Sequence, residues 1–208
     1  MNFNQSREHA LEIFKQALEA VNPIRCMKEH ISLNGNLLSI DSSQYDLKKY
    51  EAVFVIAFGK AASAMGKATE ELLGDRITDG IVISNSLPGF SFSKLRFRLS
   101  SHPIPDERSL EVAKEVLKLL EKTGEKDLVI FLISGGGSAL LAMPAPGPSL
   151  EDKRKATEML LISGVDTYGL NAVRKHLSQI KGGGLLKKAL PSQVVTLVLS
   201  DVVGDRLD

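Results

Sequence analysis

Several residue types that mark specialised classes of protein are scarce in this chain of 208 residues. A single cysteine excludes a disulfide framework within the chain, and no cluster of cysteine and histidine suggests zinc. The 26 lysines and arginines nearly balance 25 aspartates and glutamates, which argues against a protein that coats nucleic acid or binds a membrane surface. No apolar run is long enough to span a membrane, and the N-terminus shows no signal peptide, so we expect a cytoplasmic protein.

Apolar residues, in contrast, make up 43% of the chain, which is enough to build a packed core. Continuous apolar stretches are typical of strands buried in a parallel sheet, and they lie at 52–58, 80–84, 128–133 and 194–199. Apolar residues at helical spacing predict helices between them, among others over 61–73, 150–162 and 167–180. The alternation indicates an α/β fold, a doubly wound and mostly parallel sheet with helices on both faces, in a Rossmann-like three-layer domain.

The first forty residues follow a different pattern. An apolar stripe predicts an amphipathic helix over 6–21, and a short helix is expected over 23–30. Residues 31–40 contain an Asn-Gly pair between two apolar segments, which predicts a β-hairpin. Later in the chain, residues 95–99 alternate apolar side chains with arginines, which favours an edge strand.

The most informative motif is a glycine-rich loop that directly follows the apolar run 128–133. It consists of Ser134, Gly135, Gly136, Gly137 and Ser138. Glycines allow a tight turn and leave N–H groups uncovered, and serine hydroxyls add donors, so the loop suits an anion, most commonly phosphate. Neither the dinucleotide fingerprint nor the P-loop ending is present, and a tight turn without a ligand is the alternative interpretation.

Charged residues follow two other predicted strands. Lys60 comes after 52–58 at the start of a helix, where a cation opposes the helix dipole and so suggests a compensating anion. Asp201 follows 194–199 and could hold Mg²⁺ beside a nucleotide phosphate or accept a hydroxyl proton, with Asp205 as a second candidate. The alternatives are a solvated lysine and an aspartate that caps a turn.

Two further features are candidates for the same site. His102 lies in a loop with two prolines and could place an imidazole at the rim of the site or serve only to fix the loop. A polar stripe on the predicted helix over 167–180 suits a polyphosphate or an acid substrate, whereas an ordinary solvated face is the alternative. The stripe consists of Asn171, Arg174, Lys175, Ser178 and Lys181, flanked by His176.

Five motifs, taken in their order along nearly the whole chain, resemble one family. They are FGKAA at 58–62, HPIPD at 102–106, LISGGGSALL at 132–141, LNAVRKHLSQIKGG at 170–183 and LSDVVGD at 199–205. Together they resemble the class of glycerate 2-kinases that often carries the label hydroxypyruvate reductase. The resemblance implies phosphorylation of D-glycerate to 2-phosphoglycerate with ATP and Mg²⁺ as cofactors, so that glycerate and a nucleotide are the expected partners.

The same resemblance implies a domain organisation. Residues 1–208 are expected to form the N-terminal α/β domain of a longer kinase, whose C-terminal domain is absent from this chain. The family's active site is implied to lie in a cleft between the two domains. Gly184 departs from the family pattern, which commonly has arginine there.

Phosphoryl-transfer chemistry then suggests roles for the candidate residues. Lys60 is expected at the transferring phosphoryl group or the substrate carboxylate, and Asp201 at Mg²⁺ or at the glycerate 2-hydroxyl as a base. Arg174 and Lys175 would neutralise developing charge, and Asn171 would orient a ligand. The loop residues Ser134, Gly135, Gly136, Gly137 and Ser138 would cradle phosphate.

Three other functions stay open at this point. An NAD(P)-dependent hydroxypyruvate reductase would need a dinucleotide fingerprint, and none is present. A catalytically incomplete fragment would act only as a ligand-binding or structural domain. A domain that senses sugar phosphates could use similar loops, and the sequence does not determine the oligomeric state.

Overall fold

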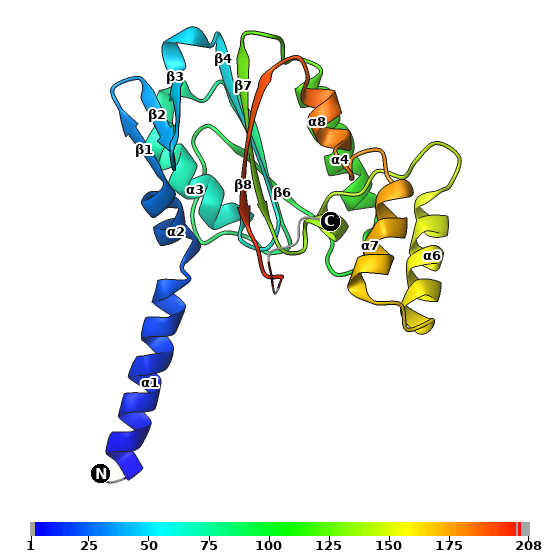
Figure 1. The fold of residues 1–208 in the computed structure, drawn as a ribbon, viewed down its shortest axis with the longest axis horizontal. Coiled ribbons are helices and arrows are strands. Elements are labelled where there is room, and N and C mark those ends of the chain that lie inside the picture. The colour runs from blue at the N-terminus through cyan, green and yellow to red at the C-terminus, as the bar shows by residue number, and fades with distance from the viewer. Residues whose placement is uncertain (1–2, 203, 205–208) are drawn as a thin grey trace.

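The computed structural model describes residues 3–202 and 204. Its centre is a parallel sheet with the strand order β6-β5-β4-β7-β8, in which every neighbouring pair is parallel (Figure 1). The strands are β4 (Ala52–Phe58), β5 (Asp79–Ser84), β6 (Arg96–Leu99), β7 (Asp127–Ser134) and β8 (Gln193–Leu199). From central β4 the chain builds one side through β5 and β6 and then the other through β7 and β8, so the sheet is doubly wound, as predicted.

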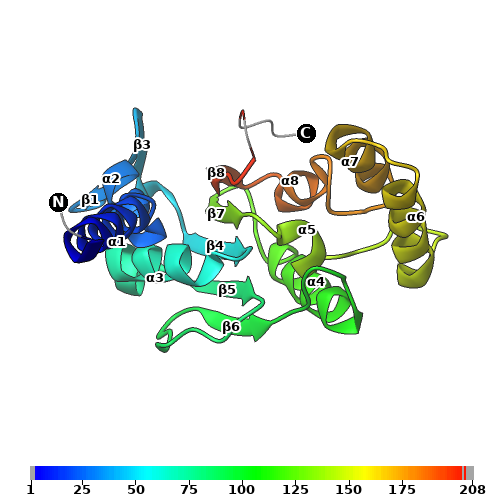
Figure 2. The ribbon, with the colours of Figure 1, turned by 90° about the horizontal axis from the view of Figure 1, so that it is seen from below.

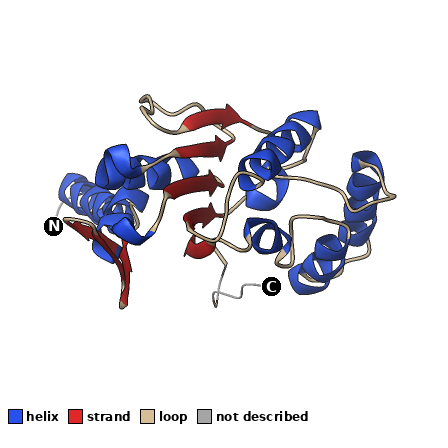
Figure 3. Ribbon diagram, turned by 90° about the horizontal axis from the view of Figure 1, so that it is seen from above, coloured by secondary structure: helices blue, strands red, loops and turns tan. Residues whose placement is uncertain are grey.

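Alternation along β4 divides the interior into two cores. Val53, Val55 and Ala57 pack into one core, whereas Phe54, Ile56 and Phe58 pack into the other. Helices α2 (Pro23–His30) and α3 (Ala62–Leu73) cover the first face, and α4 (Glu107–Leu120) and α8 (Gly184–Ala189) cover the second (Figures 2 and 3). The predicted three-layer arrangement is therefore confirmed.

A small antiparallel sheet lies beside the first face. It contains β1 (Ile31–Asn34), β2 (Leu37–Ile40) and β3 (Ser43–Asp46), and the predicted hairpin is its first two strands. Leu38 and Ile40 enter the core beneath α3, which attaches this sheet to the domain. The third strand has no apolar alternation and was not predicted from the sequence.

Helix α1 (Phe3–Ala20) extends away from the rest of the domain (Figure 1). The sequence predicts an amphipathic helix here, but the structure leaves its apolar side exposed, with Ile13 70% and Phe14 60% accessible. No residue of α1 is buried, and the helix contacts α2 where it joins the domain. The stripe that normally faces a core has no partner among the described residues.

Deletion of residues 1–20 is expected to shift the thermal midpoint by less than about 2 °C, because α1 removes no side chain from water. Circular dichroism melting of the shortened chain checks this. Extending the deletion through α2, which removes buried Met27, is the positive control and is expected to lower the midpoint clearly. A large drop from the first deletion alone would mean that α1 packs against the domain.

Two sequence predictions are wrong in detail. The stretch 194–199 was expected to be a buried strand, but β8 lies at an edge of the sheet; Val195 is its one buried residue and Val198 is 45% exposed. The helix predicted over 167–180 is α7 (Thr167–His176), four residues shorter. From Leu177 onward the backbone pairs instead with residues 143–145, through Ala145 N to Leu177 O at 3.1 Å and Gln179 N to Met143 O at 3.0 Å.

As a consequence, Ser178 and Lys181 do not continue the helical face that carries Asn171, Arg174 and Lys175. The Ser178 hydroxyl donates to Met143 O at 3.1 Å. Helix α7 packs beside α6 (Leu150–Ile162), and together they form an arm next to the sheet (Figure 1). Within the described part of the chain, no helix combines the length and apolar character that crossing a bilayer requires.

Candidate active site

The candidate site lies at the carboxyl ends of β4 and β7. These strands are neighbours, with Phe58 opposite Ile133, so the turn at 59–60 and the glycine loop 134–138 emerge side by side. Chain order reverses between them, because β5 and β6 extend from β4 whereas β8 extends from β7. Open α/β sheets bind ligands at such a switch point.

Hydrogen bonds join the two loops into one unit. Lys60 N donates to Gly135 O at 2.8 Å, and Ala61 N donates to Ser134 Oγ at 3.0 Å. Gly59 has φ +134° and lies so close that a Cβ there would be 2.6 Å from Ser134 O. Ser134 is buried and its hydroxyl accepts from the turn, so the structure places it beneath the loop.

Three side chains from three strand ends pack over the glycines. The Asp201 carboxylate, after β8, fills the space that a Cβ on Gly135 would need. His102, after β6, and Lys60, after β4, flank Gly136, where a Cβ would lie 3.0 Å from His102 Nε2 and 3.2 Å from Lys60 Cγ. The structure thus brings together Lys60, Asp201 and the glycine loop.

The opposite charges of Lys60 and Asp201 face each other, with Nζ 3.8 Å from Oδ2. Their side chains are 52% and 61% exposed, and an exposed ion pair contributes at most about 1 kcal/mol. Either group can therefore turn to a ligand at small cost. The pair is long for a charge-assisted hydrogen bond, which leaves both groups with capacity for other partners.

The loop also supplies backbone donors. Gly136 has φ +89° and directly precedes the short helix α5 (Gly137–Leu140). The first N–H groups of a helix have no acceptor inside that helix, so those of Gly137 and Ser138 are available to an anion. Ser138 is exposed and is the second residue of α5.

Asp201 could serve as a metal ligand only in company with a substrate. Among the described residues, no three His, Cys, Asp or Glu side chains gather closely enough to hold a metal ion. Mg²⁺ commonly keeps several waters and binds one or two carboxylates together with phosphate oxygens. A single aspartate beside a phosphate site meets this requirement. Asp205, the second candidate, lies outside the described residues.

The predicted residues on α7 belong to a different neighbourhood. Arg174 Nη1 donates to Asn171 Oδ1 at 3.4 Å, and the stem of Lys175 lies against Gly182. The contacts described for these residues join them to the arm and the segment after it, not to Lys60 or Asp201. Residues 143–145, which follow α5 closely, pair with the end of α7 and so connect the arm to the glycine loop.

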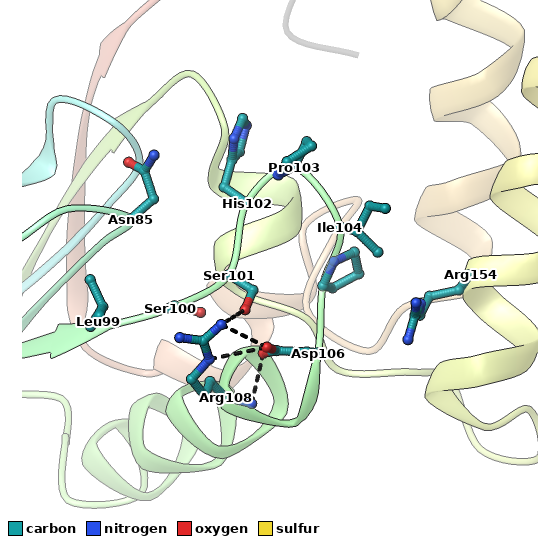
Figure 4. Close-up of a pocket in the computed structure, with 11 residues that line it drawn as sticks. Asn85, Leu99, Ser100, Ser101, His102, Pro103, Ile104, Asp106, Arg108 and Arg154 are labelled. Atoms are coloured by element: carbon teal, nitrogen blue, oxygen red, sulfur yellow. Dashed lines mark hydrogen bonds and ion pairs between the residues drawn. The ribbon is translucent and has the colours of Figure 1, made fainter.

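A cavity of about 430 Å³ opens between the loop at 99–108 and the arm. His102 lines it from one side and Arg154 of α6 faces it from the other (Figure 4). Arg108 holds the loop by donating to Asp106 and Ser101, at 2.9 and 2.7 Å. Burial alone would raise the pKa of Asp106, but hydrogen bonds from Arg108 and Ser101 outweigh burial and lower it.

Residues 9–208 match the family described as "Domain of unknown function (DUF4147)". The chain belongs to the DUF4147 family. It is 42% identical over 202 residues to a protein from Thermotoga maritima named D-glycerate 2-kinase, and the match covers 96% of this chain and 45% of that protein.

Solved structures agree with this assignment. The crystal structure of a Pyrococcus horikoshii protein superposes with a TM-score of 0.86 at 38% identity, covering 97% of this chain and 45% of that one. That of glycerate kinase from Thermotoga maritima gives 0.80 at 40% identity, covering 99% and 46%. This DUF4147 chain therefore spans about half the length of the relatives it matches.

One charged residue of this DUF4147 chain was missed by sequence reasoning. Lys153 is buried on α6, a helix in which the sequence predicted no site residue. Its spacing carried a signal, since Lys153 shares a helical stripe with Ala156, Thr157 and Leu160, the side of α6 that is least exposed. A lysine on the inward stripe of a helix can be found from sequence once the helix is predicted.

Proposed function

We propose that this chain carries phosphoryl-transfer residues of a kinase that uses ATP and Mg²⁺ to phosphorylate D-glycerate at its 2-hydroxyl. The observation that supports this most is the convergence of Lys60 and Asp201 on Gly135 and Gly136 at the switch point of the sheet. The relative named D-glycerate 2-kinase suggests the substrate. Because the chain spans about half of that relative, the activity is proposed for the protein in which this domain functions.

Phosphate binding falls to the loop. N–H groups at the start of α5 and the Ser138 hydroxyl donate to phosphate oxygens, and the turn at 59–60 fixes the loop from beneath. Lys60 stands beside Gly136, so its ammonium offsets negative charge on the transferring phosphoryl group. Positioning and charge neutralisation are the main needs of this reaction.

Asp201 is the group that would receive the proton of the substrate. As the 2-hydroxyl oxygen forms its bond to the γ-phosphorus, the bond from that phosphorus to the ADP oxygen breaks and the hydroxyl proton passes to the carboxylate. In the alternative arrangement Asp201 would hold Mg²⁺, which would supply charge neutralisation at the phosphates, and Asp205 would accept the proton. His102 limits the site on the side of Gly136.

Calorimetric titration of ATP with Mg²⁺ and of D-glycerate into this chain, together with an ADP-release assay, tests the proposal. Binding with ADP release is the expected result if the described half holds a complete site. Binding without release would mean that the remaining length of the relatives supplies missing groups. Absence of binding by both ligands would overturn the proposal. Oxidation of NADPH by hydroxypyruvate, measured in parallel, would instead favour the reductase.

A further inference from the structure

Helix α6 buries a lysine instead of an apolar side chain. Lys153 is 3% exposed and is the one buried residue of the helix, whereas Met159 is 71% and Ile162 is 86% exposed. A surface helix normally turns its apolar stripe inward, and lysine is seldom fully buried without a partner. The orientation of α6 therefore places a charge where packing alone would place a hydrocarbon.

The buried ammonium of Lys153 has no hydrogen-bond partner among the residues that the structure describes. Lys153 Nζ is shielded from solvent, and no described residue accepts a hydrogen bond from it. The Nε of Arg174, on the neighbouring helix α7, is in the same condition. Burying a charged donor without an acceptor is unfavourable, so a native fold that does so needs a compensating group.

A third cation joins these two. Burial is the larger cause, and repulsion from Arg174 the smaller, of a pKa of Lys153 that is lowered to about 8. Burial, followed by repulsion from Lys153 and Arg174, lowers the pKa of Lys181 to about 7. Helix α6, which carries Lys153, packs against α7, which carries Arg174, and Lys181 follows α7 closely in the chain. Lys153, Arg174 and Lys181 are here called the arm cluster.

Three acidic residues of the arm are engaged with other groups. Asp152 closes the capping box with Ser149, and Asp166 caps α7 through Gly169 N. Glu151 pairs with Arg154 and Lys155 on the solvent side of α6. No carboxylate contributes to the pKa shifts of the arm cluster, and the nearest hydrogen-bonded neighbour of Arg174 is neutral Asn171.

We propose that the arm cluster binds the polyphosphate chain of a nucleotide. The identity of the nucleotide as the phosphoryl donor rests on the proposed function, whereas the polyphosphate site rests on the three cations. A triphosphate carries enough negative charge to neutralise all three, while the single carboxylate of glycerate would leave two uncompensated. Arg174 offers a planar fork that matches phosphate oxygens.

The position of the arm cluster is consistent with this ligand. Arg174 and Lys181 are partly exposed, so an anion can approach from their side and recruit Lys153 from beneath. Lys181 follows the segment that pairs with residues 143–145, and those residues come shortly after α5. Nearby backbone thus ties the arm cluster to the loop proposed to hold the transferring phosphate.

The first test measures affinity for inorganic tripolyphosphate and for ATP by calorimetry. Lys153→Gln and Lys181→Gln are each expected to weaken both affinities at least about tenfold, because each removes one charge-assisted contact. Lys155→Gln, on the exposed side of the same helix, is the matched control and is expected to stay within about twofold. Failure of tripolyphosphate to bind the parent chain, or equal affinities in all three variants, would overturn the site.

Stability of the ligand-free chain separates a binding lysine from a structural one. Lys153→Met removes an unpartnered buried charge, so the thermal midpoint is expected to rise by roughly 2–4 °C, and tripolyphosphate should raise it by less than it does in the parent chain. A lysine needed for the fold would behave oppositely. A lower midpoint for Lys153→Met that tripolyphosphate raises as much as in the parent chain would contradict the proposal.

The affinity for tripolyphosphate should also depend on pH in a defined direction. Lys181 and Lys153 lose their protons near pH 7 and 8, so binding above these values requires proton uptake. Affinity is therefore expected to fall as pH rises from about 6 to about 9, by up to about tenfold per unit for each lysine that must be protonated. An affinity that is constant or rises over this range in the parent chain would count against the arm cluster.

The outcomes for the two proposals are distinguishable. If tripolyphosphate binds through the arm cluster but a protein with the full length of the relatives releases no ADP with D-glycerate, the proposed function fails and the site stands. If ADP is released and Lys153→Gln changes neither the KM for ATP nor the affinity for tripolyphosphate, the site fails and the proposed function stands.

Discussion

Replacement of Lys60 by alanine is expected to lower the rate of phosphoryl transfer about 10³-fold and to leave the fold unchanged. Lys60 lies over Gly136 at the switch point, and Gly136 directly precedes the backbone donors of α5. The side chain of Lys60 is 52% exposed and its pairing with Asp201 is weak, so truncation removes no buried contact. The loss should therefore fall on catalysis and not on stability.

Single-turnover phosphorylation of D-glycerate, measured in a protein that has the full length of the relatives, checks this prediction, and thermal melting of the same samples checks the fold. Lys126→Ala is the control, because Lys126 also forms an exposed ion pair, with Nζ 2.8 Å from Glu51 Oε1. Lys126 directly precedes β7, so it lies at the amino end of this strand, whereas the site lies at the carboxyl ends. The control should turn over within about twofold of the parent. Unchanged turnover in Lys60→Ala would remove Lys60 from the proposed site.

Replacement of Gly59 by alanine is expected to destabilise the domain by about 3–5 kcal/mol, a large part of the stability of a typical domain. Gly59 has a φ of +134°, in a region that L-residues rarely adopt. An added Cβ would also lie 2.6 Å from Ser134 O, which belongs to the backbone of the neighbouring loop. The hydrogen bonds from Lys60 N and Ala61 N to that loop would be lost as the two turns separate.

Urea unfolding followed by circular dichroism measures the change in the free energy of unfolding. Gly89→Ala is the matched control, since a Cβ there meets nothing within 4 Å and its φ is not positive. It is expected to change stability by less than about 0.5 kcal/mol. A stability loss in Gly59→Ala no greater than that of the control would show that the two loops are not locked together as described.

Sequence patterns predicted the domain well where structure depends on near neighbours. The apolar runs became β4, β5, β7 and β8, and the helix predicted over 150–162 is α6. The glycine loop could be recognised because an apolar strand that ends in three glycines is a local signal. Its association with Lys60 followed from a general rule, that the carboxyl ends of adjacent parallel strands meet.

Patterns failed where distant segments compete for the same backbone. The end of α7 looked helical by spacing, but pairing of residues 177–179 with residues 143–145 offered its backbone other partners. β8 is apolar enough for a central strand, yet the sheet order places it at an edge. Neither outcome is visible within a window of neighbouring residues.

The sequence by itself determined the α/β class, most of its elements and the glycine loop, because periodicity and turn chemistry are properties of short segments. Only the tertiary structure decided that His102, Lys60 and Asp201 meet over Gly135 and Gly136, and that Lys153 lies buried without an acceptor near Arg174 and Lys181. The physical reason is that proximity and desolvation arise from contacts between residues far apart in the chain. The sequence shows that a lysine is present, but whether its ammonium is buried and which groups surround it are known only from the tertiary structure.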